Sequence, residues 1–150
     1  MVRMSTRLTS IKAMVLGSVL VMTGCAGVVV GKTPATTFDV PINIQTAYDR
    51  TIAQAKYCLV TKDDFPLSAQ MSADRQSANV NVRMSMTGTL LADIELASLG
   101  AEKTNVSVSM WGVDTWDQAA IDAMKAAIQF GVPSCTDYFP TVPPPKRSRR

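Results

Sequence analysis

The chain contains no histidine, only three cysteines, and aromatic residues at 6% of its 150 positions. Without histidine it lacks the usual general base, the Ser-His and Cys-His nucleophile pairs and the commonest metal ligand. It also has no Gly-x-Ser-x-Gly elbow, no Gly-rich phosphate loop and no closely spaced cysteine cluster for zinc. These absences favour a protein that is not an enzyme and that carries no cofactor or metal.

Long apolar runs are scarce as well. The stretch 13–22 is apolar but has only ten residues, whereas a membrane-spanning helix needs about 20. Three basic residues precede this stretch, and the small residues Thr23 and Gly24 follow it. A basic region, a short apolar region and a small-residue cleavage site together predict a secretory signal peptide over residues 1–24.

Cys25 follows this signal directly, and the run Val21-Met22-Thr23-Gly24-Cys25 resembles the lipobox of bacterial lipoproteins. The resemblance implies that Cys25 becomes the diacylated N-terminus of the mature chain and attaches it to a membrane. Met22 departs from the pattern, because leucine is usual there. Ala26 stands where an aspartate would favour the inner membrane, so the resemblance implies the outer membrane, with the protein facing the periplasm.

Two alternatives remain open for the N-terminal region. An ordinary signal peptide could be cut after Ala26, with Gly24 and Ala26 as the small residues, or the segment could stay uncleaved as an anchor. A single acyl chain gives only marginal attachment, so the two or three chains that the lipobox implies would be needed for stable anchoring.

The net charge of +3 misrepresents the expected folded part. Removing the three basic residues of the signal from the fifteen leaves twelve, against twelve acidic residues, and four of those twelve lie within 146–150. The remainder is mildly acidic and offers no basic footprint for nucleic acid. The expected partners are the membrane, through the lipid, and an envelope protein.

Two cysteines, Cys58 and Cys135, remain after Cys25 is assigned to lipid. In an oxidising compartment such a pair predicts a disulfide. A redox-active pair is the alternative, although it usually requires Cys-x-x-Cys spacing.

Alternating apolar and polar residues predict strands at 36–42, 67–73, 78–87, 89–98 and 103–111, with turns at Gly88 and Gly100. Helical spacing predicts helices at 44–58, capped by Asn43, and at 115–130, capped by Thr115. The order β-α-β-β-β-β-α predicts an α+β two-layer sandwich, with an antiparallel sheet of four or five strands and both helices on one face.

The expected organisation is a lipidated cysteine and flexible tether at 25–37, one globular domain at 38–139, and a Pro-rich basic tail at 140–150. The tail could bind anionic headgroups or simply be a solvated end. Asp63 and Asp64 could act as paired carboxylates or bind a cation. The alternative, which is more usual for such a loop, is a solvated turn.

A candidate binding surface is the polar face of the sheet. Alternation places Arg83 and Leu91 on that face, and Trp111 falls out of phase with the buried positions of its strand. Together with Trp116, at the turn into the second helix, these residues could contact a partner, since exposed tryptophan favours such contacts. The alternative is that both tryptophans are packed beneath the start of the helix.

The architecture is similar to small Gram-negative envelope lipoproteins without an assigned role, and loosely to helix-grip modules of outer-membrane assembly lipoproteins. The similarity implies a non-enzymatic, lipid-anchored binding or scaffolding protein. The alternatives are an accessory subunit of a secretion, transport or outer-membrane assembly complex and, less favoured, an enzyme acting on cell wall or lipid.

Overall fold

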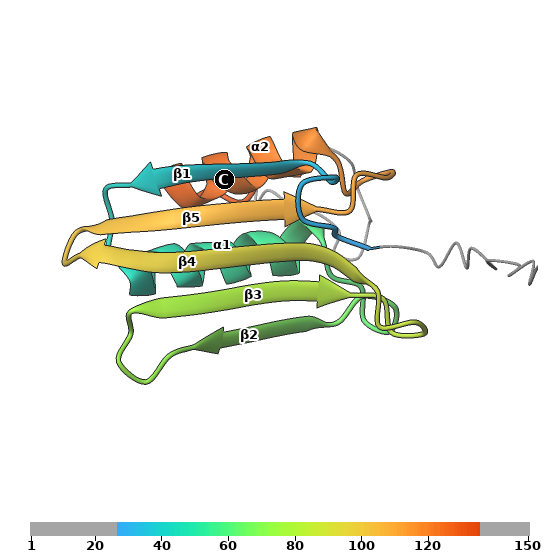
Figure 1. Ribbon diagram of the computed structural model, residues 1–150, viewed down its shortest axis with the longest axis horizontal. Helices are drawn as coiled ribbons and strands as arrows, with labels where there is room; N and C mark the ends of the chain where they lie inside the picture. Colours follow the sequence, from blue (N-terminus) through green and yellow to red (C-terminus); the bar gives the residue numbers. More distant parts are fainter. Residues whose placement is uncertain (1–26, 136–150) are drawn as a thin grey trace, which may run out of the picture.

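A computed structural model describes residues 27–135, which form a five-stranded antiparallel sheet backed by two helices (Figure 1). The elements in chain order are β1 (Ala35–Val40), α1 (Ile44–Cys58), β2 (Leu67–Met71), β3 (Ser77–Arg83), β4 (Leu90–Gly100), β5 (Lys103–Met110) and α2 (Gln118–Phe130). This confirms the predicted α+β fold and its element order. The predicted signal peptide, Cys25 and residues 136–150 lie outside the described residues.

The sheet has the order β1-β5-β4-β3-β2, and both helices of the described chain cover the same face. Figure 1 is seen from the uncovered side, with α1 and α2 behind the sheet. Strand residues on the helix side are almost fully buried; they include Val80, Val82, Ile94, Leu96, Val106 and Val108. Burying one large aliphatic side chain stabilises the fold by about 1.5–3 kcal/mol, so this layer supplies much of the driving force.

Local sequence sets the helix ends. Asn43 caps α1 as predicted, because its side chain accepts a hydrogen bond of 2.8 Å from the backbone N–H of Thr46. In α2 the cap is Asp117, whose side chain accepts a hydrogen bond from the backbone N–H of Ala120. The helix therefore starts at Gln118, and the prediction that Thr115 caps it was wrong. Both residue types can cap a helix, and the sequence did not discriminate between them.

The two helices are joined to each other by polar contacts and by a disulfide. Arg50 of α1 donates to the carbonyl oxygens of Ile128 and Gln129 at the end of α2, at 2.8 and 3.0 Å. The predicted Cys58–Cys135 disulfide is confirmed, and it spans 77 positions of sequence. In the chain-entropy model a loop of this length stabilises the fold by about 4–5 kcal/mol.

Leu91 is buried, with 0% of its surface exposed, so the expectation that it lies on the polar face was wrong. Val82 pairs with Ala92 and Arg83 pairs with Leu90, which leaves Leu91 as an extra residue opposite β3. Such a β-bulge changes the direction of side chains relative to strict alternation. Leu91 therefore joins the core beneath the helices.

The segment 27–34 lies against the sheet before β1 begins. The N–H of Val28 donates to the carbonyl oxygen of Leu90 at 2.8 Å, and the N–H of Met110 donates to that of Pro34 at 3.0 Å. A Cβ at Gly27 would collide with the Leu90 carbonyl oxygen, so this close approach requires glycine. Within the expected tether of 25–37, the described residues 27–37 therefore belong to the folded part.

The buried position of Leu91 gives a stability prediction with an internal control. Leu91→Ala should lower the free energy of unfolding by about 2–5 kcal/mol, because it leaves a cavity in the core. Leu99→Ala in the same strand, where the side chain is 52% exposed, should cost about 0.5 kcal/mol. Urea denaturation measures both changes, and equal losses would show that Leu91 does not occupy the core.

Candidate functional site

The uncovered face of the sheet carries short polar side chains in rows that cross the strands. One row crosses all five strands through directly paired residues: Thr37, Ser107, Glu95, Asn79 and Gln70. A second row, displaced by two residues, consists of Ala35, Ser109, Asp93, Asn81 and Ser68. We call this surface the open face; alternation along each strand builds it, because its residues point away from the helices.

Hydrogen bonds between side chains hold much of the open face in place. Asn79 donates to a carboxylate oxygen of Asp93 at 2.7 Å and accepts from Asn81 at 2.8 Å. The hydroxyl oxygens of Thr37 and Ser107 lie 3.2 Å apart. Because these side chains hold one another, the face is a preorganised set of donors and acceptors.

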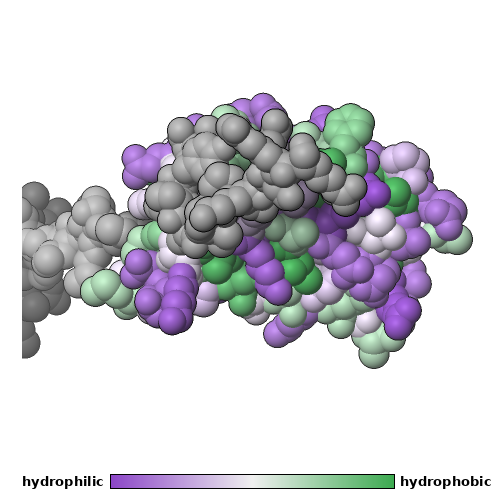
Figure 2. Space-filling view, turned by 180° about the vertical axis from the view of Figure 1, so that it is seen from behind, coloured by the Kyte–Doolittle hydropathy of each residue, from purple (hydrophilic) through white to green (hydrophobic). Residues whose placement is uncertain are grey.

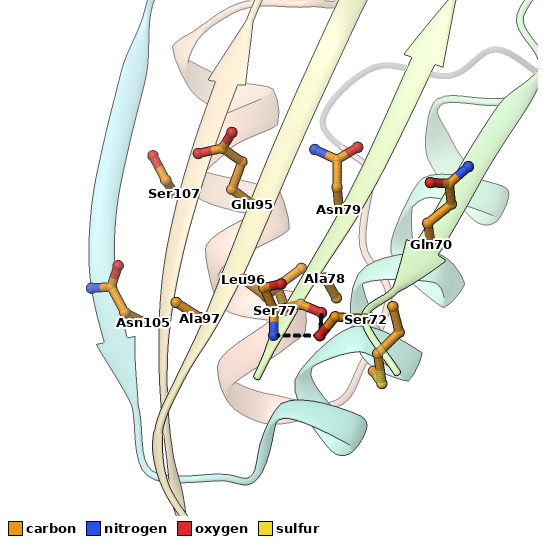
Figure 3. Close-up of a pocket in the computed structure, with 11 residues that line it drawn as sticks. Gln70, Ser72, Ser77, Ala78, Asn79, Glu95, Leu96, Ala97, Asn105 and Ser107 are labelled. Atoms are coloured by element: carbon orange, nitrogen blue, oxygen red, sulfur yellow. Dashed lines mark hydrogen bonds between the residues drawn. The ribbon is translucent and has the colours of Figure 1, made fainter. Parts of the chain in front are cut away.

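Glu95 lies at the centre of the open face, between two hollows. The larger, of about 550 Å³, extends from Glu95 and Ser107 toward Gln70 and Ser72 (Figure 3). The smaller, of about 260 Å³, is walled by the segment 28–33 and also includes Glu95 and Ser107. Among the described residues no side chain donates a hydrogen bond to the Glu95 carboxylate, so its oxygens are available to a partner.

The helix side of the molecule is different. In Figure 2, seen from that side, hydrophilic and hydrophobic residues are interspersed over the coloured part of the surface. A small hollow of about 190 Å³ lies between the helices near Arg50 and Gly131. The open face, by contrast, carries its polar side chains in two rows that cross the whole sheet.

The structure separates the four residues of the predicted binding surface. Leu91 and Trp116 are buried, and the Trp116 ring packs edge-on against Phe65 with centroids 5.6 Å apart. Trp111 is half-buried where β5 ends, and its backbone N–H donates to the carbonyl oxygen of Leu91 at 2.8 Å. Only Arg83 is exposed, and its guanidinium donates to the carbonyl oxygen of Gly88 at 3.1 Å.

The loop carrying Asp63 and Asp64 is exposed, as expected of a solvated turn. The backbone oxygens of both residues accept hydrogen bonds from Ser85, so this loop is tied to the one that follows β3. Within residues 27–135 no group of three or more carboxylate or thiol side chains is arranged to hold a metal ion.

The chemistry of the open face suits binding by hydrogen bonds and negative charge. Asp39, Asp93 and Glu95 bring three carboxylates to it, and Lys103 compensates only Asp39, at 2.8 Å. The hydroxyl of Ser107 shares a hydrogen bond with that of Thr37, and Glu95 lies opposite Ser107 on the neighbouring strand.

An amide side chain on this face lowers the pKa of Asp39. Asn105 donates to its carboxylate at 2.7 Å and, together with the Lys103 ammonium, holds the pKa of Asp39 below its ordinary value of 3.8. Since the folded-state pKa is lowered, the ionised form adds stability at higher pH. That contribution is lost as the pH falls through the folded-state pKa.

No protein-family model and no curated protein matches this chain. Neither helix among residues 27–135 is long and apolar enough to cross a membrane.

The pKa of Asp39 gives a direct test of the hydrogen bond across β1 and β5. Asn105→Ala should raise this pKa toward 3.8, because the largest stabilising contact to the ionised carboxylate is removed. Ser109→Ala on the same strand should leave it unchanged, since Ser109 pairs with Ala35 instead. Titration of the aspartate carboxyl carbons by NMR measures both, and an unmoved Asp39 in the Asn105 variant would contradict the assignment.

Proposed function

We propose that this chain is a lipid-anchored protein of the bacterial envelope, without enzymatic activity, that binds a partner protein at the outer membrane through its open face. The observation that carries the proposal is the distance in sequence between Cys25 and the folded part. Only Ala26 separates Cys25 from Gly27, which is the first residue that the structure describes and which packs against the sheet.

This spacing suits a mature N-terminus at Cys25. Successive Cα atoms are about 3.8 Å apart, so the Cα of Cys25 lies within about 8 Å of that of Gly27. A cut between Gly24 and Cys25 removes the apolar segment 13–22 while keeping all of the described residues that contact the sheet. The acyl chains would then attach at the edge of the domain itself.

The open face supports a binding role. Its amides and hydroxyls offer many hydrogen-bonding groups, as does the Glu95 carboxylate, which has no side-chain donor among the described residues. Asp93 and Glu95 place two carboxylates near its centre, which favours a partner with basic or amide groups. Aromatic side chains, which dominate many sugar-binding sites and interface hot spots, are missing from its two central rows. The chemistry therefore favours a polar, reversible contact with a protein.

Lipidation can be tested by the identity of residue 25. Cys25→Ser should abolish labelling by an alkyne fatty acid and leave unprocessed precursor, because acylation at the lipobox needs the thiol. The double variant Cys58→Ser/Cys135→Ser lacks the two other cysteines and should still be labelled.

Intact mass spectrometry of the membrane fraction completes this test. The expected mature chain begins at Cys25 and carries two or three acyl chains. Labelling of the Cys25→Ser protein, or an unmodified mature chain cut after Ala26, would overturn the proposal.

A further inference from the structure

Three exposed apolar side chains lie in three separate loops near one end of the sheet, and one of them, Val30, also borders the smaller hollow of the open face. Val30 and Met86, at 99% and 93%, are the most exposed of the large hydrophobic residues, and Val113 is 44% exposed. Isolated exposed apolar residues are ordinary on protein surfaces. These three differ from the exposed Phe130 and Val132 because their loops are joined to one another by contacts near Gly27.

Backbone contacts join the three loops. Val28 binds Leu90 at the end of the 84–89 loop, and the N–H of Trp111 donates to the carbonyl oxygen of Leu91 at 2.8 Å. Gly112 packs so closely on Pro34 that a Cβ there would lie 2.8 Å from the proline ring. Figure 1 shows the segment 27–34 and both other loops at the same end of the strands.

The 84–89 loop is itself held firmly. The N–H of Gly88 donates to the carbonyl oxygen of Met84 at 2.8 Å, and the N–H of Ser85 donates to that of Asp64 at the same distance. Met86 is thus presented at the tip of a hydrogen-bonded turn, rather than exposed by a loose loop. We call the surface formed by Val30, Met86 and Val113 the anchor end.

We propose that the anchor end inserts its apolar side chains into the interface of the phospholipid bilayer to which Cys25 is attached; this inference rests on the proposed function. With Cys25 within about 8 Å of Gly27, acyl chains in the bilayer would hold these loops close to the headgroups. Apolar side chains at such a surface enter the headgroup and acyl boundary by about 5–10 Å.

The charges around the anchor end indicate what drives this contact. Lys32 lies in one of its loops, Arg83 donates to Gly88 of another, and Lys62 lies in the neighbouring loop tied to Ser85. Asp63, Asp64 and Asp114 offset these three basic residues. Attraction to anionic lipid would need an excess of basic residues, which these loops lack. The contact is therefore apolar, and it should form on zwitterionic membranes and persist at high salt.

Insertion would fix the orientation of the domain. The strands run from the anchor end to the opposite end, where the β4–β5 turn lies beyond Leu99 (Figure 1). The sheet then stands away from the membrane, and its open face is directed sideways along the bilayer surface. A partner on the same membrane could reach it without the domain turning.

The test uses the full chain purified from membranes, with a single thiol introduced by Met86→Cys, Val113→Cys or, as the control, Leu99→Cys. The disulfide occupies Cys58 and Cys135, and acylation occupies Cys25, so a polarity-sensitive dye labels only the new thiol. The labelled proteins are placed in phosphatidylcholine vesicles, with and without brominated lipid.

We expect dye at positions 86 and 113 to shift its emission to the blue, to be quenched by brominated lipid and to lose quenching by aqueous iodide. Dye at position 99 should show none of these changes. Raising the salt should leave the pattern unchanged, and a contact that appears only with anionic lipid would contradict the apolar mechanism.

The intact mass of the same preparations separates the two proposals. An acylated protein whose three positions respond alike overturns the inference about the anchor end but leaves the proposed function standing. A protein without acyl chains overturns the proposed function and the inference with it.

Discussion

Burial of one face of the sheet under two helices is the interaction on which the rest of this structure depends. Val80, Ile94 and Val106 face α1 and α2, and alternation then necessarily turns the residues between them outward. The same constraint that builds the core thus creates the open face. The disulfide and the Arg50 contacts keep the helices in place, so the polar rows rest on a rigid support.

The contacts of the segment that precedes β1 determine which end of the sheet would lie near the attachment point. Because Gly27 and Val28 contact β4 directly, the attachment point at Cys25 would lie at one end of the strands rather than at the end of a long tether. The loops around that point are the ones that present Val30 and Met86. Anchoring and display of the open face would then be consequences of the same geometry, with the lipid beside one end and the binding surface directed sideways.

Local sequence signals predicted much of this fold. The spacing of apolar residues and the Asn43 cap predicted the first helix at its observed bounds. The two cysteines that remain once Cys25 is assigned to lipid predicted the disulfide. Leu91 was misplaced because a bulge depends on the register between two strands, which alternation within one strand does not reveal. The hollows around Glu95 could not be predicted from local sequence either, because they depend on pairing across the five strands and on the packing of residues 28–33 against the sheet.

The claim that the open face does the binding is tested most directly by photo-crosslinking in intact cells. A photoreactive amino acid is placed at Ser107, between the two hollows, or at Ala119, which is exposed on α2. The account predicts one discrete adduct from position 107 and none from position 119. Equal adducts from both positions, or an adduct from position 119 alone, would contradict it.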